Sequence, residues 1–242
     1  IKLLHKLEDE NRLANSEEQN ILSKYVGWGG LPDVFDESKD NWSEEYNELK
    51  EILTDEEYKS ARASTLTAFY TPPVVINAIY DTLKNMGVEQ ANILEPSCGT
   101  GNFLGMLPQE MQSSKLYGIE LDSISGKIAK QLYPKANIKV QGYEKADLPD
   151  SFFDIAIGNV PFGDFKVNDK RYDKNNFLIH DYFFAKTLDK VRPGGVIAFI
   201  TSKGTMDKAS PEVRKYLAQR ADLLGAIRLP DNTFTKNAGT KV

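Results

Sequence analysis

Apolar and polar residues follow different patterns on the two sides of residue 62. Residues 1–62 have helix-spaced apolar positions among many acidic side chains. In residues 63–242, short apolar runs typical of buried strands alternate with helix-spaced segments. This pattern predicts strands at 91–95, 115–121, 137–141, 153–159, 196–201 and 223–229, and helices at 101–107, 122–132, 178–191, 211–221 and directly after Pro72.

Strands that alternate with helices are typical of an α/β fold, in which a doubly wound, mostly parallel sheet carries helices on both faces. We therefore predict a helical N-terminal extension over 1–62 and an α/β domain over 63–242. Residues 240–242 resemble the start of another strand, so we expect the sheet to be truncated at its last strand. The strands at 196–201 and 223–229 would then each keep an unpaired edge.

The extension carries its own folding signals. Residues 16–19 and 54–57 have the sequence of capping boxes, and Gly27 is a candidate helix stop. Trp28 and Phe35 are candidate anchors for packing the extension on the α/β domain. The alternative is that this segment contacts a partner or lines a substrate channel.

Polar and aromatic residues follow the apolar run at 153–159. Asn159, Val160, Pro161 and Phe162 stand where a strand of an open α/β sheet ends, which is where ligands bind. The Asn159 side chain and the Val160 carbonyl offer two hydrogen-bond acceptors, and Pro161 restricts the backbone between them. Phe162 adds a flat apolar face. This set suits a planar amino group, such as the exocyclic amine of a base.

A glycine-containing turn follows the strand at 91–95. Gly99 and Gly101 allow a ligand to approach the backbone closely. Leu104 stands where the dinucleotide fingerprint needs its third glycine, so a nicotinamide cofactor is not favoured. Glu120 ends the next strand, a position from which an acid can accept both hydroxyls of a ribose.

The order of these motifs resembles that of S-adenosylmethionine-dependent N6-adenine DNA methyltransferases with the gamma-type motif order. The turn at 95–101 is similar to their Asp/Glu-Pro-x-x-Gly-x-Gly motif, and 159–162 is similar to their Asn-Pro-Pro-Tyr/Phe motif. Residues 68–73, Ala-Phe-Tyr-Thr-Pro-Pro, resemble the extra cofactor motif of that subgroup. Val160 departs from the pattern by replacing the first proline. The extension resembles the segment before such domains in large phage and mobile-element polypeptides that also carry helicase modules.

The resemblance implies a Rossmann-like methyltransferase sheet, S-adenosylmethionine as cofactor, and an adenine that is flipped out of DNA before its N6 is methylated. For the adenine amine of the cofactor, Tyr143 is nearest in position to the expected residue after the third strand, and Asp147 is the next acid. The implied catalytic residues are Asn159, Val160, Pro161 and Phe162. The implied cofactor-binding residues are Tyr70, Thr71, Pro72, Glu95, Pro96, Ser97, Cys98, Gly99, Gly101, Asn102, Phe103, Glu120, Leu121 and Tyr143.

Two other functions remain open at this point. Methyltransferases that act on an RNA base or on a protein glutamine also use Asn-Pro-Pro-aromatic motifs. A catalytically inactive cofactor- or DNA-binding module of a larger helicase-type protein is the second alternative, favoured by Val160 and by the acidic charge.

The formal net charge of −5 over 242 residues does not indicate a basic surface for DNA phosphates. We therefore expect DNA binding to involve other domains of a longer polypeptide. Cys98 is the single cysteine, which excludes an internal disulfide and fits the cytoplasm. His5 and His180 have no metal-ligand companions in sequence, and we expect neither a zinc site nor a membrane span.

A long polar loop over 163–176 follows the Asn159 motif directly. Loops of this length are functional or disordered. One interpretation is a solvated loop. The other is a lid that touches the substrate backbone through Lys166, Lys170, Arg171 and Lys174.

Overall fold

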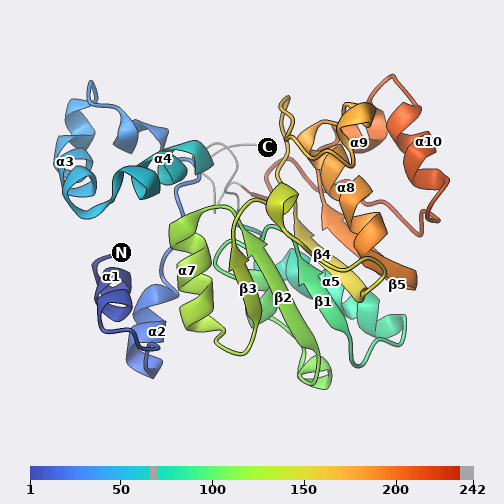
Figure 1. The fold of residues 1–242 in the computed structure, drawn as a ribbon, viewed down its shortest axis with the longest axis horizontal. Coiled ribbons are helices and arrows are strands. Elements are labelled where there is room, and N and C mark those ends of the chain that lie inside the picture. The colour runs from blue at the N-terminus through green and yellow to red at the C-terminus, as the bar shows by residue number, and fades with distance from the viewer. Residues whose placement is uncertain (66–69, 235–242) are drawn as a thin grey trace.

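The computed structural model describes residues 1–65 and 70–234. A five-stranded sheet forms its centre, in the order β3-β2-β1-β4-β5 with every neighbouring pair parallel (Figure 1). This architecture confirms the predicted doubly wound α/β fold. The strands are β1 (Asn92–Glu95), β2 (Lys115–Glu120), β3 (Asn137–Val140), β4 (Phe153–Asn159) and β5 (Val191–Ile200).

Apolar side chains of the strands pack against helices on both faces of the sheet. Ile155 and Ile157 of β4 belong to a buried cluster with Ile76 of α5, whereas Ala156 between them packs in a second cluster with Phe183 of α8. This alternation is the two-residue periodicity of a strand that is buried on both faces. The helices of this domain are α5 (Pro73–Asn85), α6 (Asn102–Gly105), α7 (Ser123–Leu132), α8 (Ile179–Lys190), α9 (Gly204–Asp207) and α10 (Glu212–Ala218).

The order of the strands creates a switch point between β1 and β4. From β1 the chain moves outward to β2 and β3, and it then returns to place β4 on the other side of β1. Ligands of open α/β sheets bind outside the carboxyl ends of the strands at such a point. The glycine turn after β1 and the Asn159 motif after β4 are therefore brought to the same edge.

The N-terminal extension contains α1 (Lys2–Asp9), α2 (Ser16–Leu22), α3 (Ser43–Ile52) and α4 (Asp55–Ser64). It packs on α7, because Ile124 and Ile128 of that helix share one buried cluster with the apolar residues of the extension (Figure 1). Trp28 and Phe35 belong to this cluster, with their rings edge-to-face at 5.2 Å. The predicted anchoring role of these two aromatic residues is confirmed.

Two local predictions in the extension need correction. The cap of α2 is Asn15 rather than Ser16: its side chain accepts the Glu18 N–H, and Glu18 accepts the Asn15 N–H, each at 2.9 Å. Both residues are good caps, and the glutamate three positions after Asn15 selects it. Gly27 does not end α2, which already stops at Leu22, and the predicted capping box at Thr54 is confirmed.

At the other end of the chain, β5 begins at Val191 instead of residue 196, because Val191 already pairs with Phe153 of β4. The predicted strand over 223–229 is wrong: the chain from 221 to 230 has neither helix nor strand. Leu223, Leu224 and Ile227 are 70%, 73% and 89% exposed there, so these apolar residues are not packed as a strand would require. The predicted strand at 240–242 lies outside the described residues, as do Ala68 and Phe69. In the described ranges, no helix has both the length and the apolar character that crossing a membrane requires.

Candidate active site

A direct hydrogen bond joins the two predicted motifs at the carboxyl edge of the sheet. The Ser97 hydroxyl donates to the main-chain oxygen of Asn159 at 2.9 Å, across 62 positions of sequence. The ends of β1 and β4 are therefore held in contact at the switch point. A ligand bound by the turn and a ligand bound by the Asn159 motif would be neighbours.

The glycine turn has a backbone that favours glycine. Gly99 and Gly101 have φ angles of +54° and +88°, in the left-handed region that other residues rarely adopt. At Gly101 a Cβ atom would also lie 2.5 Å from Cε2 of Tyr133. Tyr133, which follows α7, packs on this turn and was not among the predicted site residues. An aromatic residue at the end of a helix carries no signal that distinguishes it from an ordinary core residue.

Glu120 braces the same turn. One of its carboxyl oxygens accepts the Gly99 N–H and the other accepts the Asp122 N–H, each at 2.7 Å. Burial raises the pKa of the Glu120 carboxyl to about 7, although the two backbone N–H groups favour its charged form. Each carboxyl oxygen has a second lone pair, so Glu120 can still accept hydroxyl groups of a ligand.

Glu95 lies deeper at the end of β1. It is 2% exposed, and its Oε2 atom has no hydrogen-bond partner among the described residues. A Cβ atom at Gly158 of β4 would lie 3.3 Å from Cγ of Glu95, so glycine at 158 leaves room for this side chain. Burial, followed by the charge of Glu120, raises the pKa of the Glu95 carboxyl well above its ordinary value.

Glu95 and Glu120 are both poorly solvated, and burial disfavours their charged forms. A ligand with positive charge compensates for this loss of solvation by direct electrostatic attraction. S-adenosylmethionine carries a sulfonium and an ammonium group, as well as two ribose hydroxyls. The unpartnered Glu95 oxygen and the spare lone pairs of Glu120 therefore fit this cofactor.

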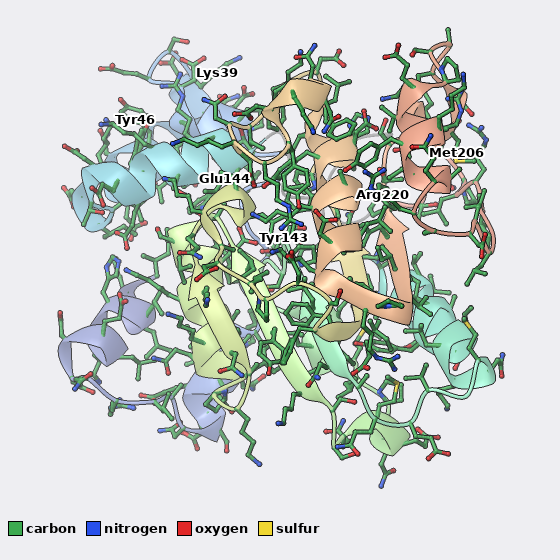
Figure 2. All side chains as sticks on the ribbon, turned by 45° about the vertical axis from the view of Figure 1, so that its right-hand side comes forward. Lys39, Tyr46, Tyr143, Glu144, Met206 and Arg220 are labelled. Carbon is green, nitrogen blue, oxygen red and sulfur yellow. The ribbon has the colours of Figure 1, made fainter. Side chains whose placement is uncertain are left out.

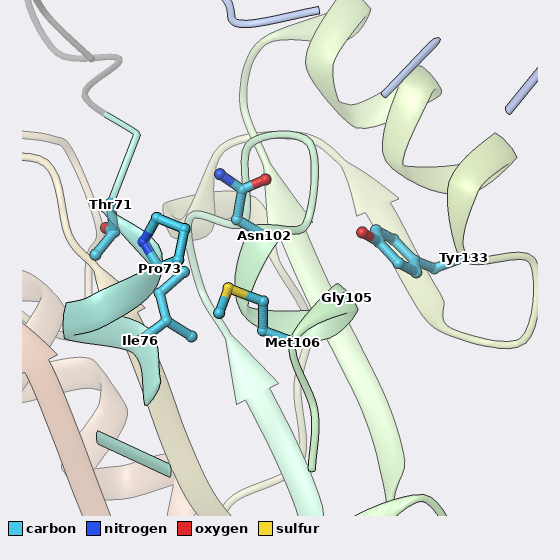
Figure 3. A pocket seen from close by; sticks show the side chains of 7 residues that line it. All are labelled: Thr71, Pro73, Ile76, Asn102, Gly105, Met106 and Tyr133. Atoms are coloured by element: carbon cyan, nitrogen blue, oxygen red, sulfur yellow. The ribbon is translucent and has the colours of Figure 1, made fainter. Parts of the chain in front are cut away.

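A cavity of about 260 Å³ opens beside the turn. Pockets for drug-sized ligands measure about 300–1,000 Å³, so this space would accommodate part of a cofactor. In Figure 3 the side chains of Thr71, Pro73 and Ile76 face Asn102 and Met106 across it. The cavity brings the predicted residues Thr71 and Asn102 to one place, and Gly105 and Tyr133 complete its lining.

Other predicted cofactor residues have different surroundings. The Tyr70 ring lies against Gly99, whereas Phe103 is 2% exposed in the core and its carbonyl accepts the Tyr80 hydroxyl. Cys98 is also buried, and burial raises the pKa of its thiol. Leu121 is 71% exposed. Pro72 precedes α5 as its N-cap, and Pro96 is buried directly after Glu95.

Tyr143 corrects the prediction made for the residue after β3. Its side chain is 3% exposed and packs between the sheet and α8, with its ring 4.9 Å from that of Phe183 (Figure 2). Its hydroxyl forms a 3.0 Å hydrogen bond with Thr187. The Tyr143 side chain is a core residue and is not available to a cofactor, because α8 covers it. The sequence did not reveal that α8 would pack over Tyr143.

The Asn159 motif places its residues in distinct roles. Val160 is 1% exposed, and its N–H donates to the Ile200 carbonyl of β5 at 3.1 Å. A proline could not make this bond. The valine thus extends the ladder between β4 and β5 by one hydrogen bond. This bond restrains the backbone where a proline would restrain it through its ring. Asn159, Pro161 and Phe162 are only partly buried.

The loop over 163–176 is tied back to the domain. Asp169 accepts the Tyr182 hydroxyl at 2.7 Å and pairs with Lys186 at 3.1 Å. Arg171 pairs with Asp150 and Asp189, each at 2.9 Å. Of the four basic residues predicted for a lid, Arg171 is thus engaged within the protein. Lys166 donates to Asn176 at 2.5 Å, while Lys170 and Lys174 are exposed.

Comparison with known proteins adds independent findings. The sequence profile of the N-6 DNA methylase family matches residues 37–242. The Defense against restriction protein B of Escherichia phage P1 is 30% identical over 248 residues, which cover 100% of this chain and 9% of the phage protein. The Type II methyltransferase M.CvrRI of Paramecium bursaria Chlorella virus XZ-6E is 34% identical over 94 residues, which cover 39% of this chain and 24% of the viral protein. The chain thus spans only a small part of either relative.

Among solved structures, a Listeria monocytogenes protein that is described as a class I S-adenosylmethionine-dependent methyltransferase superposes on this chain with a TM-score of 0.61 at 15% identity. The superposition covers 97% of this chain and 76% of the Listeria protein. At this identity the likeness supports the fold, which agrees with the sheet described above.

Proposed function

Since the chain belongs to the N-6 DNA methylase family, we propose that it transfers the methyl group of S-adenosylmethionine to the N6 amino group of adenine in DNA. The observation that carries this proposal is the position of Asn159 to Phe162. These residues end β4 at the switch point, next to the glycine turn, and the Ser97–Asn159 hydrogen bond holds the two motifs together.

The chain's own residues would orient the amine. The Asn159 side-chain oxygen and the Val160 carbonyl accept the two N6 hydrogens, which aims the nitrogen lone pair away from the ring system. Phe162 stacks on the base. S-adenosylmethionine supplies the methyl group when it is bound. No strong base is needed at the amine, so catalysis rests on positioning and on preorganised acceptors.

The cofactor would be held by the glycine turn and the two acids. Glu120 accepts ribose hydroxyls on its spare lone pairs, and Glu95 faces the positive charge of the ligand from within the protein. Thr71 and Asn102 line the cavity beside the turn, where they contact the remainder of the ligand.

DNA would reach this edge with its target base already extruded, because N6 is inaccessible within a stacked duplex. The chain carries a net charge of −5 and offers little general attraction for phosphates. We infer that further segments of a longer polypeptide supply most of the DNA affinity. The small part of each relative that this chain matches agrees with that inference.

The test is a transfer assay with tritiated S-adenosylmethionine and separate pools of DNA, RNA and protein. We expect label in DNA only, released on digestion as N6-methyladenine. Label in RNA or on protein glutamine would replace the proposed substrate with one of those acceptors. Cofactor binding by calorimetry without any transfer would support a non-catalytic module, and the absence of binding would overturn the cofactor site itself.

A further inference from the structure

A loop of the N-terminal extension touches the glycine turn through a single aromatic ring. A Cβ atom at Gly27 would lie 2.6 Å from Cε2 of Tyr70, and one at Gly99 would lie 3.4 Å from Cε1 on the other edge of the same ring. The Tyr70 ring therefore lies between the extension and the turn. Only glycine permits this contact, because Gly27 also has a φ angle of +71°.

The loop that carries Gly27 is itself held firmly. Trp28 is 8% exposed, and its ring packs edge-to-face against Tyr25 at 6.0 Å and Phe35 at 5.2 Å. The Gly30 N–H donates to the Thr65 carbonyl at 3.3 Å, which ties the loop to the end of α4. Gly27 is thus presented to Tyr70 by a packed structure.

A second connection runs from the extension to the same turn. The Ser60 hydroxyl of α4 donates to Asp122 at 3.0 Å, the Asp122 N–H donates to Glu120, and Glu120 accepts the Gly99 N–H. Both connections end at Gly99. Burial raises the pKa of the Tyr70 hydroxyl, so this side chain remains neutral beside Glu120 and Asp122.

We propose that the loop over 25–30 is an outer wall of the cofactor site, in which Gly27 is a positioning residue that sets the Tyr70 ring over the glycine turn. The inference rests on the cofactor site assigned under the proposed function. It goes further in one respect, because the family profile begins at residue 37 and the wall lies before it. The extension then does more than cover α7.

The wall would act on the nucleoside half of the ligand. One edge of Tyr70 faces Gly99, whose N–H donates to Glu120, the predicted acceptor for ribose. A methyl group at position 27 would push the ring towards the turn and into the space that the nucleoside needs. A displaced ring would weaken binding of S-adenosylmethionine and of its demethylated product S-adenosylhomocysteine alike.

The test compares Gly27→Ala with Gly87→Ala in the full chain, by titration with S-adenosylhomocysteine in a calorimeter. Gly87 has a φ angle of +84°, and a Cβ atom added there would have nothing within 4 Å, so its variant carries the backbone strain without a collision. We expect Gly27→Ala to weaken binding about tenfold and Gly87→Ala to change it by less than about twofold.

Tyr70→Ala completes a double-mutant cycle. We expect it to weaken binding by itself, and to abolish the further effect of Gly27→Ala, because the ring that the added methyl group would meet is gone. Equal binding by the two glycine-to-alanine variants, or full additivity in the Tyr70→Ala background, would overturn the wall while leaving the cofactor site intact. No binding by the native chain would instead overturn the cofactor assignment, and the wall with it.

If Gly27→Ala does not fold, hydrogen exchange on the native chain tests whether the loop over 25–30 is part of the cofactor site. S-adenosylhomocysteine should slow exchange in a peptide spanning 25–31, as well as in the turn at 95–101. Protection of the turn with unchanged exchange at 25–31 would show that the loop is not part of the site.

Discussion

The carboxyl edge of the sheet has two halves: the cofactor half is the glycine turn with Glu95 and Glu120, and the substrate half is the Asn159 motif with the loop after it. They differ in how deeply their side chains are buried. In the cofactor half, Glu95 is 2% exposed and both oxygens of Glu120 already accept backbone N–H groups. In the substrate half, Phe162 is only partly buried and Phe165, three residues later, is 45% exposed. Under the proposed function, the acids assigned to the cofactor are thus already buried (Glu95) or hydrogen-bonded within the protein (Glu120), whereas the aromatic residues beside the proposed base site remain accessible.

This contrast predicts that the two halves can be damaged separately. Variants after β4 should change methyl transfer with little effect on cofactor affinity. Variants around the glycine turn should lower cofactor affinity, with little effect on methyl transfer at saturating S-adenosylmethionine.

Asn159→Ala should have the largest effect. It removes one of the two acceptors for the amine, so methyl transfer should fall by about 10²–10³-fold, the size found for loss of one preorganised polar group. Its main-chain bond to Ser97 is retained, so affinity for S-adenosylhomocysteine should be unchanged. Single-turnover transfer and calorimetry measure the two quantities, with the exposed Asn168→Ala as the control. Native turnover by Asn159→Ala would show that this residue only shapes the end of the strand.

Glu120→Ala should weaken cofactor binding by about 100-fold, because ribose hydroxyls lose their acceptor and the Gly99 and Asp122 N–H groups lose theirs. Calorimetry checks the prediction, and the exposed Glu89→Ala is its control. Since Glu120 also braces the turn, some loss of thermal stability should accompany the loss of affinity. An unchanged dissociation constant would remove Glu120 from the site.

Phe162→Ala should raise the KM for DNA without changing cofactor affinity. Base–aromatic stacking contributes about 1–3 kcal/mol, which corresponds to about 5- to 150-fold. Phe152→Ala, at the opposite end of β4, provides a matched control. An equal rise in KM for both variants would indicate a general effect of losing a ring near this strand.

The pH dependence of cofactor binding sharpens the comparison further. The pKa of Glu120 is raised to about 7, so its carboxyl is neutral below that pH and charged above it. The charged form is the better hydroxyl acceptor and attracts a cationic ligand. Affinity for S-adenosylmethionine should therefore rise with pH, by about tenfold at most between pH 6 and pH 8. Calorimetry at both pH values should show a flatter dependence in Glu120→Gln, and an unaltered slope there would assign the effect to another group.

Val160→Pro should have the smallest effect on transfer, because the carbonyl that faces the amine is kept. The hydrogen bond to Ile200 is lost, which should lower the free energy of unfolding by about 1 kcal/mol. Denaturant unfolding measures this difference, and the exposed Val74→Pro at the start of α5 is the control, because proline is tolerated in the first turn of a helix. A large loss of transfer with normal stability would show that valine tunes the site itself.

Much of the fold followed from apolar patterning, and the failures have local causes. The bounds of β4 were predicted correctly, since a mostly apolar run that ends at Asn159 marks a strand buried on both faces. The run at 223–229 has similar composition, but a strand also needs a partner, and a pattern does not state which edge is available. The strand predicted from residue 196 lacked the start of β5, because Val191 pairs with Phe153 before a register shift that precedes the pairing of Val196 with Ile155.

The candidate site was predictable where a motif requires a backbone conformation. The predicted glycine-containing turn follows β1, and Gly99 and Gly101 have positive φ angles in it. Tyr143 was predicted as a cofactor residue but packs in the core, and Tyr133 lies on the glycine turn but was not predicted. The environment of both aromatic side chains depends on helices, which an apolar pattern does not place in space. The contact between Gly27 and Tyr70 also joins segments of two separate regions, so no local pattern marks it.

The bond between Ser97 and Asn159 has a consequence for how the protein folds. β1 and β4 are adjacent in the sheet, yet β2, α7 and β3 lie between them in the chain. Closing such a long loop costs chain entropy before any contact offsets it, and parallel pairings of this kind form slowly. We therefore expect the junction between the two motifs to form late, after β2 and β3 have paired. Appearance of cofactor binding during refolding would report completion of the sheet rather than formation of the glycine turn.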